Sequence, residues 1–282
     1  MKLKWKVLFL LAGFSLVMSS IFSDNEKPVP GLYNEILKFS IEVKGISMGS
    51  IIMRTVKTGP KYLQINANVE SFDSLKGIYY VAGNFGAMWD YQKRKSYMAF
   101  EDVYDGYSYH RRAYRFQDDN KILVNLRESR FSDAGYPHSE KPTIDNTKEY
   151  FIDNDDYQDL IGVFFFLRTS GMHPKPGDVY RLKVLPAGVK QIMIVQVVDV
   201  NEMNVPALGG KRKVVHVKSG LANPDQKSSG GNIFFNVRSP LDMYFTDDED
   251  SIPLRISAKL PIIQTADVVL TDYKQIKKKK SD

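Results

Sequence analysis

The chain has 282 residues, of which 43% are hydrophobic, and it has no cysteine, which excludes disulfide bridges, thiolate metal ligands, a cysteine nucleophile and a lipidated cysteine. Its formal net charge of +6 comes from the two ends, because residues 1–23 and 277–282 together hold the whole excess and residues 24–276 are neutral. A neutral body lacks the basic face of nucleic-acid-binding proteins, so we expect no nucleic-acid partner.

The first 23 residues have the layout of a secretory signal peptide. Lys2, Lys4 and Lys6 precede an apolar run over residues 7–18, and small residues at 19, 20 and 23 follow it. The run is shorter than the roughly 20 residues that a membrane-spanning helix needs. We therefore expect cleavage and export to the periplasm or cell envelope, with residues 24–30 as a linker. An uncleaved anchor that extends to Phe22 is the alternative.

Strands dominate the body of the chain. Residues 37–44 and 63–70 alternate between apolar and polar side chains, and residues 254–260 repeat the pattern, as half-buried strands do. Turn signals such as Gly59-Pro60 and Asp105-Gly106 separate the runs. Further strands are predicted over 51–56, 97–104, 108–116, 180–185, 191–200, 213–218, 232–237 and 268–273.

Residues 45–49 match the G-x-S-x-G pattern of a nucleophile elbow around Ser47. That elbow needs a strand, a strained turn and then a helix. Here residues 49–53 continue as another strand, so the pattern predicts a hairpin turn and no nucleophile.

Aromatic residues are densest between residues 79 and 116, where they occupy 12 of 38 positions. Tyrosine and tryptophan have large apolar faces with a polar tip, which suits stacking on sugars or on the glycerol region of a lipid. Trp89, Tyr91 and Tyr97 are therefore the candidate ligand-binding residues. The alternative is that these side chains are ordinary strand residues.

One helix is predicted, over Asp156–Thr169. Asn154 or Asp155 would cap it, and Gln158 stands at the capping-box spacing from Asp155. Its centre, residues 163–167, is apolar on every side, so the helix should be buried against the sheet. The polar stretch 129–147 before it predicts a long surface loop.

The sequence offers no catalytic or metal-binding motif. The four histidines at 110, 138, 173 and 216 are scattered, and none forms a zinc-binding pair. The acidic run 246–250 lacks the glycine and the ligand spacing of an EF-hand loop and predicts a hairpin connection. We assign no catalytic residue, no metal and no cofactor.

Residues 275–282 form a basic tail. Its lysines would each gain about 1 kcal/mol near anionic lipid headgroups, which makes peripheral membrane contact one interpretation. A frayed, solubilising terminus is the other. The lysines are Lys277, Lys278, Lys279 and Lys280.

Five short phrases, taken in order, resemble the exported bacterial family catalogued as domain of unknown function 3108. The resemblance covers residues 31–274, and it implies export and a β fold without implying any reaction. Two positions differ from the family pattern, namely Asn34, where glycine is usual, and the segment 261–263. The phrases are residues 34–39 with the turn 45–49, residues 159–168, 176–178, 244–248 and 252–255.

We therefore predict a mainly β protein with a single domain over residues 31–274. Its fold would be a curved antiparallel sheet or open barrel of about ten or more strands, with the helix buried in the concave side. The expected function is binding of a lipid, glycolipid or glycan in that concavity. A carbohydrate-active hydrolase, with two carboxylates converging in a pocket, and a structural or interaction protein of the envelope are the alternatives.

Overall fold

The computed structural model describes residues 34–75, 80–132, 141–169, 174–222, 240–259 and 265–276. The predicted signal peptide, the linker 24–30, the strand 232–237 and the lysines of the tail lie outside these residues, as do His138 and His173.

Fourteen strands form one sheet in the described residues, and every pair of neighbouring strands is antiparallel. The strands are β1 (Glu35–Val43), β2 (Ile46–Thr58), β3 (Tyr62–Ser71), β4 (Val81–Asp90), β5 (Lys95–Asp105), β6 (Ser108–Phe116), β7 (Lys121–Arg130), β8 (Ile144–Asp153), β9 (Val179–Val184), β10 (Gln191–Val205), β11 (Gly210–Ala222), β12 (Leu241–Thr246), β13 (Pro253–Ala258) and β14 (Ala266–Gln275). The remaining elements are helix α2 (Leu160–Thr169) and the short 3-10 turns η1 (Asp73–Leu75), η2 (Pro186–Gly188) and η3 (Pro206–Leu208).

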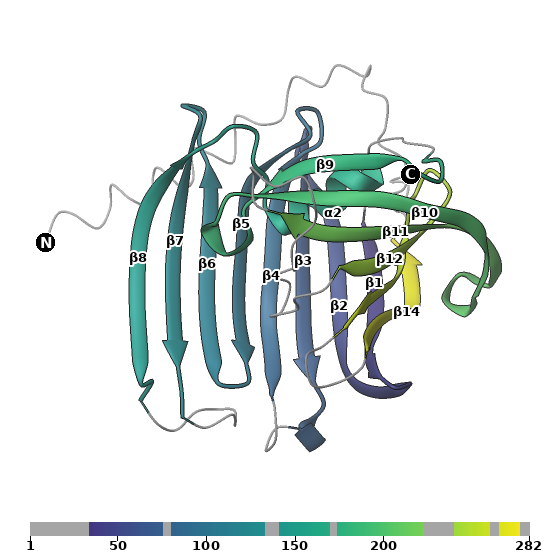
Figure 1. Ribbon diagram of the computed structural model, residues 1–282, viewed down its shortest axis with the longest axis horizontal. Helices are drawn as coiled ribbons and strands as arrows, with labels where there is room; N and C mark the ends of the chain where they lie inside the picture. The colour runs from purple at the N-terminus through teal and green to yellow at the C-terminus, as the bar shows by residue number, and fades with distance from the viewer. Residues whose placement is uncertain are drawn as a thin grey trace, which may run out of the picture.

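The sheet runs in the order β8-β7-β6-β5-β4-β3-β2-β1-β14-β13-β12-β11-β10-β9, so β8 and β9 are its two edges and it does not close. The connection between these edges carries α2. In Figure 1, β1–β8 stand side by side as one layer, β9–β12 run across that layer, and α2 lies between the two. This arrangement confirms the predicted fold class.

Strands β4, β7 and β8 lie where no strand was predicted. β8 replaces the end of the expected surface loop, and β7 covers its beginning, so the prediction of a loop over 129–147 was wrong at both ends. β8 is an edge strand with most of its side chains exposed, and it therefore lacks the alternation that marks a half-buried strand. In β4, Gly86 interrupts the pattern because the Phe100 ring of β5 occupies the place of its missing side chain.

The first hairpin explains the G-x-S-x-G match. Lys44 and Gly45, which join β1 to β2, have φ angles of 52° and 75°, as the two central residues of a type I′ turn require. Ser47 is already in β2, and its hydroxyl lies 2.7 Å from that of Ser40. The predicted hairpin is confirmed.

The acidic run 246–250 is the connection between β12 and β13, also as predicted. The Asp248 carboxylate accepts hydrogen bonds from the Thr246 hydroxyl at 2.7 Å and from the backbone N–H groups of Asp250 and Ser251 at 3.1 Å each. The hydrogen bonds of the Asp248 carboxylate therefore stabilise the turn between β12 and β13.

Helix α2 is buried, which confirms the prediction from its apolar centre. Phe165 has no exposed surface, and its ring stacks on Trp89 of β4 with 5.4 Å between the centroids. On another face of the helix, Val163 joins a core with Val195 and Val217 from β10 and β11. The helix thus fills the space between the two layers of the sheet.

The start of the helix differs from the prediction. Asp159 is the N-cap, because its carboxylate accepts the backbone N–H groups of Ile161 at 2.8 Å and Gly162 at 2.9 Å. It also accepts a hydrogen bond from the Ser96 hydroxyl of β5. The preceding Gln158 donates its backbone N–H to the Lys183 carbonyl of β9 and accepts the N–H of Leu185, the residue after β9, so it lies outside the helix. Asn154 caps only a turn, by accepting the N–H of Tyr157.

At its other end α2 is held by a buried ion pair. Arg168 donates through both terminal nitrogens to the Glu35 carboxylate of β1, with 3.1 Å between Nη2 and Oε2. It also donates to the Asp250 carbonyl at 3.1 and 3.3 Å. The side chains of Arg168 and Glu35 are 2% and 0% exposed. One guanidinium thus joins the helix, β1 and the turn between β12 and β13.

We predict that Arg168→Met lowers the free energy of unfolding by about 3–5 kcal/mol, because it leaves the Glu35 carboxylate buried without its partner. Urea denaturation measures the change. Adding Glu35→Gln should restore part of the loss, since it removes the uncompensated charge. Arg111→Met, on an exposed side chain of β6, is the control and should change the value by less than about 0.5 kcal/mol. Equal stability of Arg168→Met and the wild type would contradict the prediction.

A second prediction concerns Asp159, whose pKa burial raises above its ordinary value despite the hydrogen bonds that it accepts. The folded state therefore binds this proton more tightly than the unfolded chain. The stabilisation is complete below about pH 4, the ordinary aspartate range, and it is lost as the pH rises through the raised pKa. Asp159→Asn has no carboxyl group to titrate and should not show this loss. The free energy of unfolding of the variant should therefore rise relative to that of the wild type as the pH rises.

Urea denaturation at several pH values tests this expectation. Asp156→Asn is the control, because the pKa of Asp156 is shifted in the opposite direction. The hydrogen bond and the charge of Lys95 lower this pKa. That control should lose stability relative to the wild type only above its lowered pKa. A difference between Asp159→Asn and the wild type that stays constant with pH would refute the prediction.

Candidate functional site

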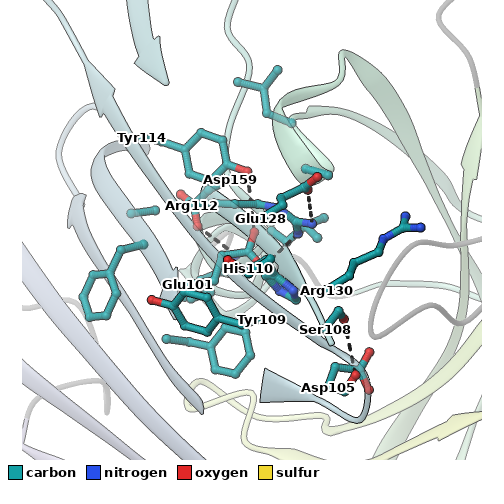
Figure 2. A pocket seen from close by; sticks show the side chains of 18 of the residues that line it. Glu101, Asp105, Ser108, Tyr109, His110, Arg112, Tyr114, Glu128, Arg130 and Asp159 are labelled. Carbon is teal, nitrogen blue, oxygen red and sulfur yellow. Dashed lines mark hydrogen bonds and ion pairs between the residues drawn. The ribbon is translucent and has the colours of Figure 1, made fainter. Parts of the chain in front are cut away.

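The concave face of the sheet holds a pocket of about 480 Å³ beside the N-terminal end of α2. Strands β4–β7 form its floor, and the first turn of α2 and the segment around η2 form a wall. Figure 2 shows charged side chains of β5, β6 and β7 gathered on this floor.

Two glutamates and one arginine form the centre of the floor. Nη1 of Arg112 lies 3.3 Å from Oε2 of Glu101, and Nη2 lies 3.3 Å from Oε1 of Glu128. Each carboxylate therefore accepts a hydrogen bond from one terminal nitrogen of the guanidinium (Figure 2). The Arg112 and Glu101 side chains are 15% and 21% exposed, whereas Glu128 is 46% exposed. Glu128 is thus the carboxylate most open to a ligand.

Strand register brings these residues together. Glu101 of β5 pairs with Arg112 of β6, and His110 of β6 pairs with Glu128 of β7. Residues opposite each other in antiparallel strands place their side chains on the same face. Tyr114 belongs to the same row of β6, because alternate residues share a face.

The electrostatics of the floor favour a charged Glu101. Burial acts to raise its pKa, but the hydrogen bond from His110 and the charge of Arg112 outweigh burial and hold the pKa below its ordinary value. The Tyr114 hydroxyl lies 3.5 Å from Glu101, and burial together with that carboxylate raises the pKa of Tyr114. At neutral pH Glu101 is therefore an anion, and Tyr114 stays protonated.

Apolar side chains complete the pocket. Leu160 and Ile161 of α2 and Leu185 before η2 line one side, and Phe85 of β4 lines another. Tyr107, in the turn between β5 and β6, also lines the pocket and is 54% exposed. The site thus combines an ionised floor with apolar walls and one exposed aromatic ring.

The three aromatic residues predicted from the sequence do not form one site. Trp89 is fully buried against Phe165, and Tyr91 is 9% exposed in the same core. Tyr97 is 38% exposed, and its ring lies 5.4 Å from that of Tyr62. None of the three lines the pocket. Their role in binding stays a prediction. The residues that line the pocket are others, among them Glu101, Arg112 and Glu128.

Sequence reasoning missed the charged floor, although a signal for it was present. The aromatic-rich segment contains Glu101 and Arg112 at positions where alternation places side chains on the buried face of a strand. Charged residues at inward positions of neighbouring strands indicate a polar cluster, because isolated buried charges are costly.

Glu101 and Glu128 converge on Arg112, but a glycosidase also needs one carboxyl group of the pair to act as an acid. The lowered pKa of Glu101 opposes a role for this carboxylate as the proton donor at neutral pH. In the part of the chain that the structure describes, no three potential ligands from His, Cys, Asp and Glu are placed to hold a metal ion. The arrangement is better suited to accepting hydrogen bonds from a ligand than to catalysis.

Over the described ranges, no helix has the length and hydrophobicity that a membrane crossing would require.

Solved structures that this chain matches come from several bacteria. A β-barrel-like protein of the DUF1849 family from Brucella abortus has a TM-score of 0.55 and 10% identity, covering 87% of this chain and 99% of its own. A protein with a YmcC-like fold from Bacteroides fragilis has a TM-score of 0.34 and 11% identity, with 87% and 97% covered. A hypothetical protein from Chlamydia trachomatis has a TM-score of 0.35 and 6% identity, with 88% and 89% covered. The Brucella structure supports the fold alone.

Among curated proteins, none matches this sequence. A family model does match, over residues 38–271, and its description is "Protein of unknown function (DUF3108)". The match spans nearly all of the described sheet, from β1 to β14. The chain therefore belongs to the DUF3108 family.

Proposed function

We propose that this protein is an exported cell-envelope protein that binds a lipid, glycolipid or glycan in the concave pocket. The observation that carries the proposal is the combination of an ionised floor around Arg112 with apolar walls formed by Leu160 and Leu185. Ligand pockets have this composition, a mostly apolar lining with a few placed polar groups.

The size of the pocket supports the proposal. Its volume of about 480 Å³ lies within the roughly 300–1,000 Å³ that is typical of small-molecule sites. A headgroup or a short oligosaccharide would fit in a pocket of this size, and the apolar walls suit part of an acyl chain. This arrangement needs no proton transfer from Glu101, whose lowered pKa opposes such a role.

The proposed location rests on the sequence. Residues 1–23 have signal-peptide features, and the lysines of the tail, Lys277, Lys278, Lys279 and Lys280, would add a contact with anionic headgroups. A binding protein placed there meets lipids and glycans in its own compartment.

Native mass spectrometry of protein purified from its own envelope tests the binding function. We predict a bound lipid or glycan on the wild type and its loss in Ser108→Trp, because Ser108 lines the pocket at a partly exposed position where an indole ring would occupy the space of the ligand.

Arg111→Trp is the matched control, since it places the same ring on an exposed neighbouring residue of β6 that does not line the pocket. It should keep the ligand. A wild-type protein that is free of any adduct under conditions that preserve known lipid complexes would refute the proposal.

The location has its own test. Cell fractionation followed by N-terminal sequencing should find the protein in the envelope with a new N-terminus between residues 20 and 25. Cytosolic protein that still begins with Met1 would contradict export, whereas membrane-bound protein with Met1 would establish the uncleaved anchor.

A further inference from the structure

The charges around the pocket restrict the kind of headgroup that it accepts. Carboxylates outnumber guanidinium groups in its lining, and the carboxylates are not all buried. The acidic groups are Glu101, Asp105, Glu128 and Asp159, and the basic groups are Arg112 and Arg130, with His110 beside Glu101.

The terminal nitrogens of Arg112 are poorly placed to bind an anion. Both of its terminal nitrogens are engaged by carboxylates, at 3.3 Å each. A phosphate that approached Arg112 would meet the carboxylates of Glu101 and Glu128 first, and like charges placed against each other repel. The floor therefore opposes an anionic headgroup.

The floor of the pocket also opposes a wholly apolar ligand. It would cover Glu128, whose side chain is 46% exposed, and remove water from that carboxylate without replacing its hydrogen bonds. The floor needs a ligand that donates hydrogen bonds to carboxylate oxygens.

Hydroxyl groups meet this requirement without adding charge. Sugar hydroxyls donate to Glu128 and accept from Arg130, whose guanidinium makes no ion pair with the described residues. The exposed ring of Tyr107 offers a face on which a pyranose stacks. An attached acyl chain would run along Leu160 and Leu185.

We propose that the pocket selects a neutral, hydroxyl-rich headgroup, as in a glycolipid, over an anionic one. The inference rests on the proposed binding function and narrows its ligand class from the charge arrangement at Glu101, Arg112 and Glu128.

Isothermal titration calorimetry tests the selection with three amphiphiles that share a decyl chain, each kept below its critical micelle concentration. The probes are decyl maltoside, decyl phosphate and decyltrimethylammonium. For the wild type, we expect decyl maltoside to bind at least about tenfold more tightly than decyl phosphate, because a single unfavourable charge contact exceeds about 1.4 kcal/mol.

Glu128→Gln tests the cause of the selection. It removes one negative charge from the floor and leaves Nη2 of Arg112 without its ion pair, so the affinity for decyl phosphate should rise several-fold while that for decyl maltoside falls. Asp272→Asn is the matched control, because it removes the same charge from the exposed Lys38–Asp272 pair of β1 and β14, and neither of these residues lines the pocket. It should leave both affinities unchanged. An equal rise in phosphate affinity for both variants would overturn the inference, since net charge alone would then explain it.

The outcomes separate this inference from the proposed function. Tighter binding of decyl phosphate or decyltrimethylammonium, lost in Ser108→Trp, would overturn the headgroup selection and leave pocket binding intact. Binding of all three probes that is unaffected by Ser108→Trp, or no binding together with no adduct in native mass spectrometry, would overturn both.

Discussion

The buried contact between Arg168 and Glu35 determines how the sheet can be arranged. β1, which carries Glu35, stands between β2 and β14, where the strands that follow one another from β1 to β8 meet those from β9 to β14. α2 belongs to the connection between the two edges. A guanidinium that leaves water for this position must satisfy its donors there, and Glu35 with the Asp250 carbonyl satisfies them. The helix between the edges is thus fastened to the middle of the sheet.

The pocket is a consequence of that placement. With its C-terminal end fixed at β1, α2 begins over β5, where Asp159 accepts the hydrogen bond of Ser96. Its side chains cover Trp89 and the neighbouring core residues. The helix is only ten residues long, so it leaves the inward row around Glu101 uncovered. The boundary between core and pocket on this face is therefore set by the length and anchoring of one helix.

Alternation predicted the strands that have one buried face, such as residues 37–44 and 63–70, because burial on one side imposes a period of two. It failed for β8, where exposure on both faces removes the pattern. The capping-box spacing failed to locate the helix start, because the backbone hydrogen bonds of Gln158 to Lys183 and Leu185 are long-range contacts. Alternation identifies inward residues of a strand, but it cannot tell which of them a helix covers. Trp89 was therefore a plausible ligand contact, and Glu101 was not considered.

The charged floor is costly for a structure that needs only stability. Replacing a buried ion network by apolar residues of similar size is often neutral or stabilising, because the charges no longer lose their hydration. The concave face has apolar residues elsewhere, as the valines around Val163 show, so nothing in the sheet demands ions at this place. The hydrogen bond from His110 and the charge of Arg112 together hold the pKa of Glu101 below its ordinary value and keep it ionised inside the protein. Perturbed, ionised groups in a concave pocket are typical of functional sites. The ion cluster of Glu101 and Arg112 is therefore the feature of this face on which the proposed binding site rests.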